Sequence, residues 1–182
     1  MKLLDITDKD VYNALEKLFQ MFLPEGTPIV RGQQNGVPLP DVPCVIMTTI
    51  GVPDRIGTNA ESTEAVTNAQ GEITGFEALA EADFKYTVQA DFYSPDAESW
   101  AMATELIWRG NIGFSAMPDG MKPLYSEGRQ QLPLVGGENQ WIQRWTMTLV
   151  LDYQPTYSQA TQAATTVTVV PEAIDVFFPT AT

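Results

Sequence analysis

The sequence predicts an α+β fold: a mainly antiparallel sheet with two helices packed on one face, plus extended loops or arms. Five or six segments have the character of strands, with alternating apolar and polar residues in the two clearest of them, and two segments repeat apolar residues at helical spacing. The helices lie between runs of strands, which favours α+β over a doubly wound parallel sheet. We expect one domain over residues 1–155 and a C-terminal extension over residues 156–182, because 182 residues are close to the size of one domain.

The first expected element is a helix that begins after Thr7. Thr7 and Asp10 have the spacing of a capping box, and Pro24 and Gly26 end the helix. Between them runs an apolar stripe that should face the core: Val11, Leu15, Leu18, Phe19 and Phe22.

Extended segments follow this helix. Residues 28–33 predict a short strand, and Asn35-Gly36 is a turn signal. Residues 37–43 contain three prolines, so they should be extended but form few ladder hydrogen bonds. Residues 44–50 are rich in β-branched side chains and predict a strand.

Residues 51–80 are different in character. They are polar, rich in Gly, Thr, Asn and Glu, and without a sustained period. We interpret them as a long loop or exposed hairpin inserted into the domain, and long segments of this kind are usually functional or mobile.

A strand and the second helix come next. Residues 84–93 alternate as a half-buried strand does. Ser94, Pro95 and Asp96 then predict a helix start, with the helix over residues 95–109 ended by Gly110. Its expected buried residues are Ala97, Trp100, Ala101, Thr104, Ile107 and Trp108.

The strongest strand is expected near the end of the domain. Residues 111–137 are turn-rich, with a short strand over residues 123–126, and residues 139–153 alternate again. One face carries Trp141, Trp145, Met147, Leu149, Leu151 and Tyr153, and the other Arg144, Thr146, Thr148 and Asp152. In the extension, residues 166–170 have strand character, and the apolar end carries Ile174, Val176, Phe177 and Phe178.

Composition excludes several classes of function. The chain has 23 acidic and 10 basic residues and no histidine, giving a net charge of −13. The acidity argues against binding to nucleic acid or anionic lipid, and the lack of histidine excludes Ser-His-Asp triads and imidazole metal sites. The single cysteine, Cys44, cannot form an internal disulfide and should be buried. The N-terminus has no signal-peptide pattern and no segment is long enough to span a membrane, so we expect a protein made in the cytoplasm.

Possible catalytic groups are weak. The glycine pairs Gly71/Gly75 and Gly110/Gly113 lack the other residues of a phosphate loop and should be turns. The neighbouring acids Glu61/Glu64, Glu77/Glu81 and Glu81/Asp83 lie in polar surroundings, which predict solvated groups. Asp91 and Asp152 could be neighbours across the sheet but are expected to be exposed. We therefore expect no catalytic, cofactor-binding or metal site, and we expect Trp100, Trp108, Trp141 and Trp145 to belong to the core.

An ordered series of short strings runs through about residues 84–155. It comprises DFYSPDA at 91–97, LIWR at 106–109, PLYS at 123–126, RQQLPLV at 129–135, GENQW at 137–141, RWTMT at 144–148 and LDYQP at 151–155. This series resembles the neck or tail-terminator proteins of tailed bacteriophages. Residues 51–80 and those after 156 carry little of this resemblance.

The resemblance implies a structural virion protein and not an enzyme. Such proteins form a ring, here expected to be a homohexamer, that caps the tail tube and joins it to the head–tail connector. The implied partners are further copies of the chain, the tail tube or sheath protein and the connector; genomic DNA passes through without specific binding, and no membrane is involved. The alternative hypothesis is a small acidic ligand-binding module or hydrolase that uses surface aromatics and paired carboxylates.

The acidity is concentrated in residues 54–98. Two basic residues, Arg55 and Lys85, accompany ten acids there: Asp54, Glu61, Glu64, Glu72, Glu77, Glu81, Asp83, Asp91, Asp96 and Glu98. If these carboxylates line a ring, they would repel phosphate and let a duplex slide.

Overall fold

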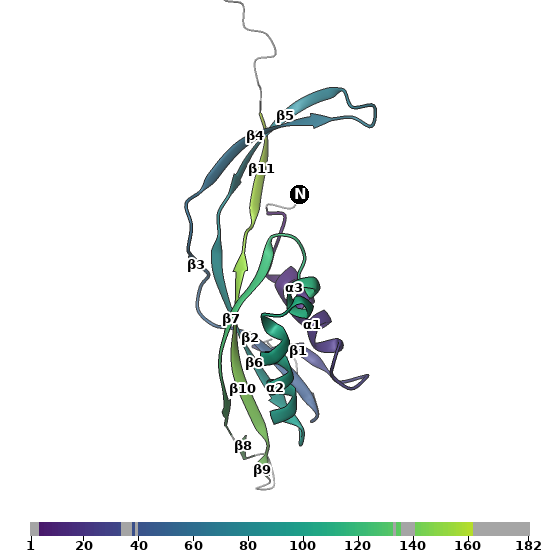
Figure 1. Cartoon of the computed structure of the whole chain (residues 1–182), viewed down its shortest axis with the longest axis vertical. Coiled ribbons are helices and arrows are strands. Elements are labelled where there is room, and N and C mark those ends of the chain that lie inside the picture. The colour runs from purple at the N-terminus through teal and green to yellow at the C-terminus, as the bar shows by residue number, and fades with distance from the viewer. Residues whose placement is uncertain (1–3, 34–37, 39, 133, 136–140, 162–182) are drawn as a thin grey trace, which may run out of the picture.

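The computed structural model describes residues 4–33, 38, 40–132, 134–135 and 141–161 (Figure 1). The helices are α1 (Asp8–Gln20), α2 (Ala97–Trp108) and α3 (Asn111–Ala116). The strands are β1 (Ile29–Arg31), β2 (Cys44–Thr49), β3 (Asp54–Arg55), β4 (Ala60–Thr67), β5 (Ile73–Glu81), β6 (Phe84–Tyr93), β7 (Met121–Gln131), β8 (Leu134–Val135), β9 (Trp141–Ile142), β10 (Arg144–Tyr153) and β11 (Thr156–Thr161). The predicted α+β class is confirmed.

The main sheet has the strand order β1-β2-β6-β10-β7, with β3 beside β6. Only β1 and β2 among its pairs run parallel. All three helices lie on one face of this sheet (Figure 1). We call the main sheet and its helices the body, and the face of the sheet turned away from the helices the outer face.

The core of the body fills the space between the helices and the sheet. The alternation predicted for β6 and β10 is confirmed, since their core-facing residues include Phe92 and Leu149, both fully buried. The apolar stripe of α1 packs on these strands through Phe19, whose ring lies edge to face with that of Phe92, with 5.7 Å between the ring centroids. Burying such side chains contributes about 1.5–3 kcal/mol each and fixes the helices on the sheet.

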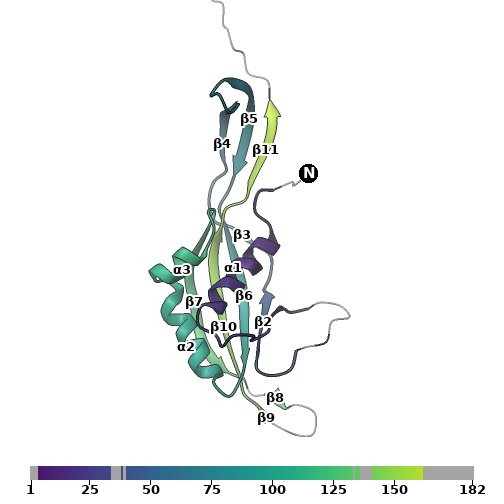
Figure 2. The same cartoon turned by 90° about the vertical axis from the view of Figure 1, so that its right-hand side faces the viewer.

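A second, three-stranded sheet projects from one end of the body (Figure 2). Its order is β11-β5-β4, all antiparallel, and we call it the arm. Of the two alternatives for residues 51–80, the structure has the hairpin, formed by β4 and β5. It is joined to the body because β5 leads into β6 and β10 leads into β11.

One antiparallel ladder runs through both sheets. Tyr153 faces Phe84 at the end of the β10–β6 pair, and three residues further on Thr156 faces Glu81 in the β11–β5 pair. The register is therefore unchanged where the ladder passes from the body into the arm.

Other segments hold this junction. The Thr156 N–H donates to Asp5 Oδ1 at 2.6 Å, and the Asp5 N–H donates to the Thr156 carbonyl at 3.2 Å. Beside the junction, the Gln154 N–H donates to the Gly120 carbonyl at 2.8 Å. The Ile56 N–H donates to the Asp83 carbonyl at 3.0 Å. These bonds satisfy backbone groups that the interrupted ladder leaves free.

Several expected boundaries are wrong. Residues 111–116 form α3, which was expected to be turn-rich, and Gly113 inside it is buried where a Cβ would collide with the Trp108 carbonyl. Helix propensity disfavours that glycine, so a close packing contact and not local preference explains it. Strand β7 is longer than the expected residues 123–126, and α2 begins at Ala97 with Asp96 as its N-cap. The strand expected over residues 139–153 is interrupted at Gln143 between β9 and β10.

The expected turn at Asn35-Gly36, the strand at residues 166–170 and the apolar end at residues 174–178 lie outside the described residues.

Candidate assembly surfaces

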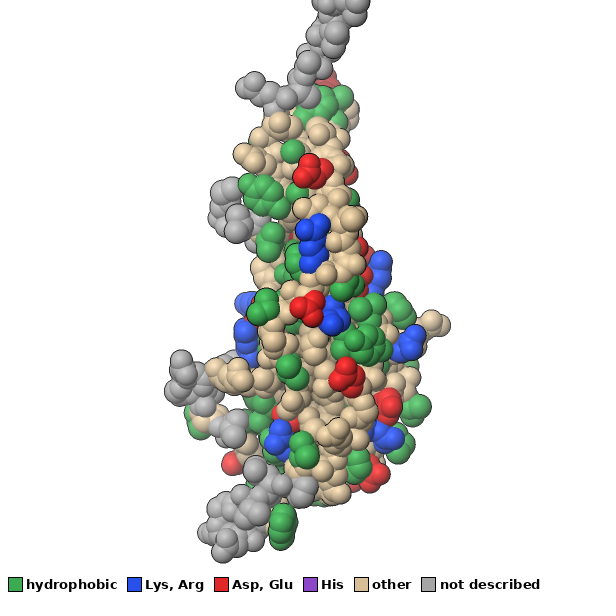
Figure 3. All heavy atoms as spheres, turned by 90° about the vertical axis from the view of Figure 1, so that its left-hand side faces the viewer, with side chains coloured by type: hydrophobic (Ala, Val, Ile, Leu, Met, Phe, Trp, Pro, Cys, Tyr) green, Lys and Arg blue, Asp and Glu red, His purple; other side chains and the backbone are tan. Residues whose placement is uncertain are grey.

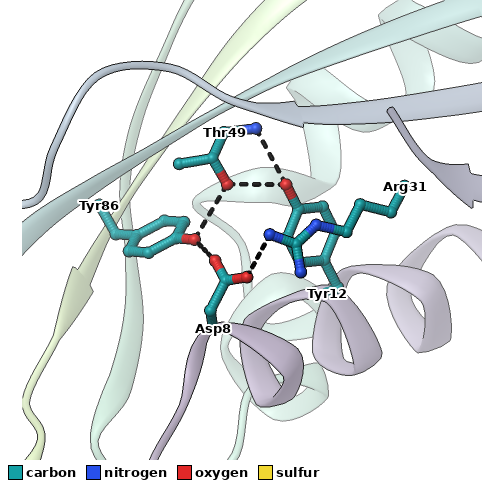
Figure 4. Close-up of polar contacts among 5 residues, drawn as sticks. All are labelled: Asp8, Tyr12, Arg31, Thr49 and Tyr86. Carbon is teal, nitrogen blue, oxygen red and sulfur yellow. Dashed lines mark hydrogen bonds and ion pairs between the residues drawn. The ribbon is translucent and has the colours of Figure 1, made fainter. Parts of the chain in front are cut away.

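A polar cluster fastens α1 to the sheet (Figure 4). The Asp8 carboxylate accepts from the Tyr86 hydroxyl and pairs with the Arg31 guanidinium at 2.6 Å. Thr49 joins the two tyrosines, with its Oγ1 2.7 Å from the Tyr12 hydroxyl and 2.9 Å from that of Tyr86. Each polar side chain is thus matched by another, so the cluster positions the helix. Sequence reasoning missed it because its members are far apart in the chain.

The outer face carries a buried ion pair. Asp91 is 5% exposed, and its Oδ1 accepts from Arg144 Nε at 3.2 Å and Nη2 at 3.0 Å. Gln89 Nε2 donates to both carboxylate oxygens, at 3.0 and 2.9 Å. The expected exposure of Asp91 is therefore wrong, because the register places a guanidinium beside it. Asp91 and Asp152 are not cross-strand neighbours either, since Asp91 faces Thr146.

Asp152 lies at the other end of β10, near the junction. It faces Lys85 on β6 and Lys122 on β7, yet its Oδ1 is buried and has no hydrogen-bond partner among the described residues. Desolvation raises the pKa of this carboxyl above its ordinary value, and the negative charge of Asp83 adds to the shift, while Lys122 opposes it.

Most of the outer face carries uncharged or paired side chains (Figure 3). Lys85 Nζ lies 3.3 Å from Asp54 Oδ2, and the Arg144 guanidinium lies 5.7 Å from the Tyr93 ring centroid. Such a face presents little net charge to a neighbour.

The arm is exposed and acidic. All eight residues of β4 are exposed. The arm strands contain no lysine or arginine, and Glu64 lies directly opposite Glu77. Like charges in that position destabilise a sheet by themselves, so the arm gains little from its own side chains.

The neighbouring acids Glu61/Glu64 and Glu77/Glu81 lie along the two strands of the hairpin. Glu61 and Glu64 point to opposite faces of β4, since they are three residues apart on a strand. Glu77 and Glu81 share a face of β5 but lie about 13 Å apart along it. Gly71 has a φ of +82° and lies in the β4–β5 turn as expected, whereas Gly113 lies inside α3.

The tryptophans divide between core and surface. Trp108 is fully buried and its Nε1 donates to the Tyr125 carbonyl at 2.9 Å, Trp100 is buried, and Trp145 packs against the core. Trp141 is 73% exposed, so its expected core position is wrong; the break at Gln143 separates it from the face of β10. Cys44 is buried as expected, and burial raises the pKa of its thiol.

An apolar strip lies on the outward side of α2. Met102 and Leu106, one turn apart, are 42% and 76% exposed, and Ile112 of the adjoining α3 is 50% exposed. Exposed apolar side chains close to one another are typical of contact surfaces.

Two absences hold within the part of the chain that the structure describes. His, Cys, Asp and Glu side chains form no group of three or more that could hold a metal ion. No helix there has the length and apolar character needed to cross a membrane.

Comparison with known proteins gives one family match. A family model described as "Phage neck terminator protein" matches residues 10–177. No curated protein sequence is significantly similar to the chain. Among solved structures, the sheath/tube terminator of PVC, an extracellular contractile injection system, in its extended state, is 14% identical with a TM-score of 0.44. The alignment covers 94% of this chain and 64% of that one, so this chain spans less than two thirds of the other's length.

Proposed function

The chain belongs to the phage neck terminator family, and from this premise we propose that it forms a six-membered ring that caps the tail tube and joins it to the head–tail connector. Membership of the family gives the chain a structural role in the virion tail. The ring, its symmetry and its partners, which are the tube or sheath protein on one side and the connector on the other, are the proposal.

The arm is the observation that carries this proposal. It is a three-stranded sheet that projects from the body, has no buried core of its own and leaves an edge strand fully exposed. Such a sheet is a poor source of stability but a good template for a neighbouring chain. Ring subunits join through two different surfaces of each copy, and the arm and the apolar strip of α2 supply two such surfaces.

The arm also supports a DNA-conducting lumen. Five of the ten acids in residues 54–98 lie on the arm or its turn: Glu61, Glu64, Glu72, Glu77 and Glu81. Asp91 and Asp54 are paired with basic side chains and contribute little free charge. Arms that point inward would surround the duplex with carboxylates and repel its phosphates.

Electron microscopy of the purified chain, alone and with tail tubes, tests the proposal. We expect six-fold rings on one end of the tubes, with the arm density toward the axis. A chain that stays monomeric at high concentration and neither caps tubes nor binds the connector contradicts the ring. Rings whose arms point to the outer rim contradict the acidic lumen while leaving the terminator role in place.

A further inference from the structure

We propose that residues 166–170 of one subunit add as a fourth strand to the free edge of β4 in the arm of the next subunit. The inference deepens the proposed ring and rests on it for closure, but the strand exchange is tested separately below.

The acceptor is the outer edge of β4. In the arm β4 pairs with β5 on one side, and no described strand pairs with its other side. Its eight residues are all exposed, they include no proline or lysine, and their only charged side chains are Glu61 and Glu64. The edge therefore presents unpaired backbone N–H and C=O groups to any strand that reaches it.

The donor leaves from the opposite edge of the same sheet. Described residues end at Thr161, the last residue of β11, and β5 separates β11 from β4. A strand on the free side of β4 would lie three strand spacings from β11, about 14 Å away. Five residue steps from Thr161 to Thr166 span at most about 17 Å, and the chain would also have to rise over the side chains of β5 and β4. A connection to the subunit's own β4 edge would therefore be almost fully extended, which favours the edge of a neighbouring arm as the acceptor.

The chemistry of the donor suits this edge. Residues 166–170 are Thr, Val, Thr, Val and Val, all β-branched and uncharged, and Pro171 follows them. Pairing two β4 edges with each other would instead add Glu61 and Glu64 of one arm to those of the other, and like charges oppose that arrangement. The acidic edge thus disfavours its own copy and accepts a neutral strand.

Donor and acceptor at opposite edges give a directional contact. Each subunit gives a strand on one side and takes one on the other, which is the head-to-tail relation that closes into a ring. A symmetric pair of arms would end at a dimer.

Disulfide trapping in the full chain tests the exchange. Val167→Cys is combined in turn with Ser62→Cys, Thr63→Cys and Glu64→Cys, so that both faces of β4 are sampled. Cross-strand cysteines close a disulfide only when their Cα atoms lie within about 7 Å. We expect at least one pair to give a ladder of covalent oligomers on a denaturing gel after oxidation, while each single variant gives none.

A matched pair tests the rival pairing. Gln159→Cys with Thr168→Cys reports a strand that folds back on the free side of its own β11, and its product is a cross-linked monomer. That product, or no intermolecular product from the β4 pairs, overturns the inference. Electron microscopy of the same samples separates the two proposals, because rings without the β4 cross-link reject the exchange alone, and a chain that never associates rejects both.

A charge variant gives a second readout. Val167→Asp with Val169→Asp would place carboxylates beside Glu61 and Glu64, so we expect association to weaken about tenfold or more. Thr180→Asp adds a charge beyond Pro171 and should leave association unchanged. Equal association of both variants, with unchanged thermal melting, contradicts the proposed strand.

Discussion

The body and the arm share two continuous segments of the chain, β5–β6 and β10–β11, yet differ in what surrounds these strands. In the body β6 and β10 carry fully buried side chains such as Val88, Phe92 and Leu149. In the arm their continuations, β5 and β11, are half-buried or exposed, and β4 is exposed throughout. The comparison shows that a regular hydrogen-bonded ladder needs no core where it is anchored at one end, and that the arm's side chains are free to serve contacts.

Energetically the two regions should respond differently to the same kind of change. The stability of the body depends on apolar burial, which contributes about 25 cal/mol per Å². An isolated hairpin is marginal in water, so the arm depends on its anchoring in the body and on whatever binds it.

The largest difference is expected from core and arm truncations. Phe92→Ala removes a fully buried ring that meets Phe19 at 5.7 Å, and it should lower the free energy of unfolding by about 3–5 kcal/mol. Val66→Ala on β4 should cost less than about 0.5 kcal/mol. Urea denaturation of both variants measures the contrast, and similar costs at the two sites would show that the arm has a core of its own.

A smaller effect is expected from the ion pair on the outer face. Arg144→Ala leaves the Asp91 carboxylate, 5% exposed, without a cation, and should lower the free energy of unfolding by about 2–3 kcal/mol. Adding Asp91→Asn should recover part of that loss. Lys85→Ala, which breaks the exposed pair with Asp54, is the control and should cost less than about 0.5 kcal/mol. If Arg144→Ala and Lys85→Ala lower the free energy of unfolding equally, burial does not distinguish the Arg144–Asp91 pair from the Lys85–Asp54 pair.

The smallest effect concerns Asp152 at the junction of body and arm. Because the pKa of this carboxyl is raised in the folded protein, its charged form opposes folding above that pKa. Asp152→Asn should therefore raise the free energy of unfolding at pH 7, by less than about 1 kcal/mol given solvent screening. The gain should shrink as the pH falls through the raised pKa and vanish below the ordinary value of 3.8. Denaturation at several pH values checks this, and a gain that persists at low pH would assign it to packing.

Much of the body could be predicted from the sequence because its signals are local. The alternation of β6 and β10, the stripe of α1 and the capping pair Thr7–Asp10 each depend on neighbours in the chain. The class, the first helix and the central strands are confirmed for that reason.

The remaining features depend on residues that are distant in sequence. Gly113 permits α3 through its approach to Trp108, and Asp91 is buried because Arg144 lies beside it. Likewise, β4 is mostly polar and β5 has no alternation between a buried and an exposed face, so the hairpin gives a weak strand pattern. The exposure of Trp141 follows from a break in the strand that alternation does not reveal.

The unbroken register of the ladder has a mechanical consequence. The ladder begins at the pair Tyr93–Arg144 in the body and ends at the pair Phe76–Thr161 in the arm. Over this length the same two segments of the chain lie side by side, with hydrogen bonds perpendicular to the strands. A force that pulls the arm away from the body along this axis is carried by two continuous backbones, because β5 leads into β6 and β10 leads into β11. A force that peels β4 sideways instead loads the hydrogen bonds between β4 and β5 one at a time. The molecule is thus built to resist tension along its long axis and to yield at its free edge.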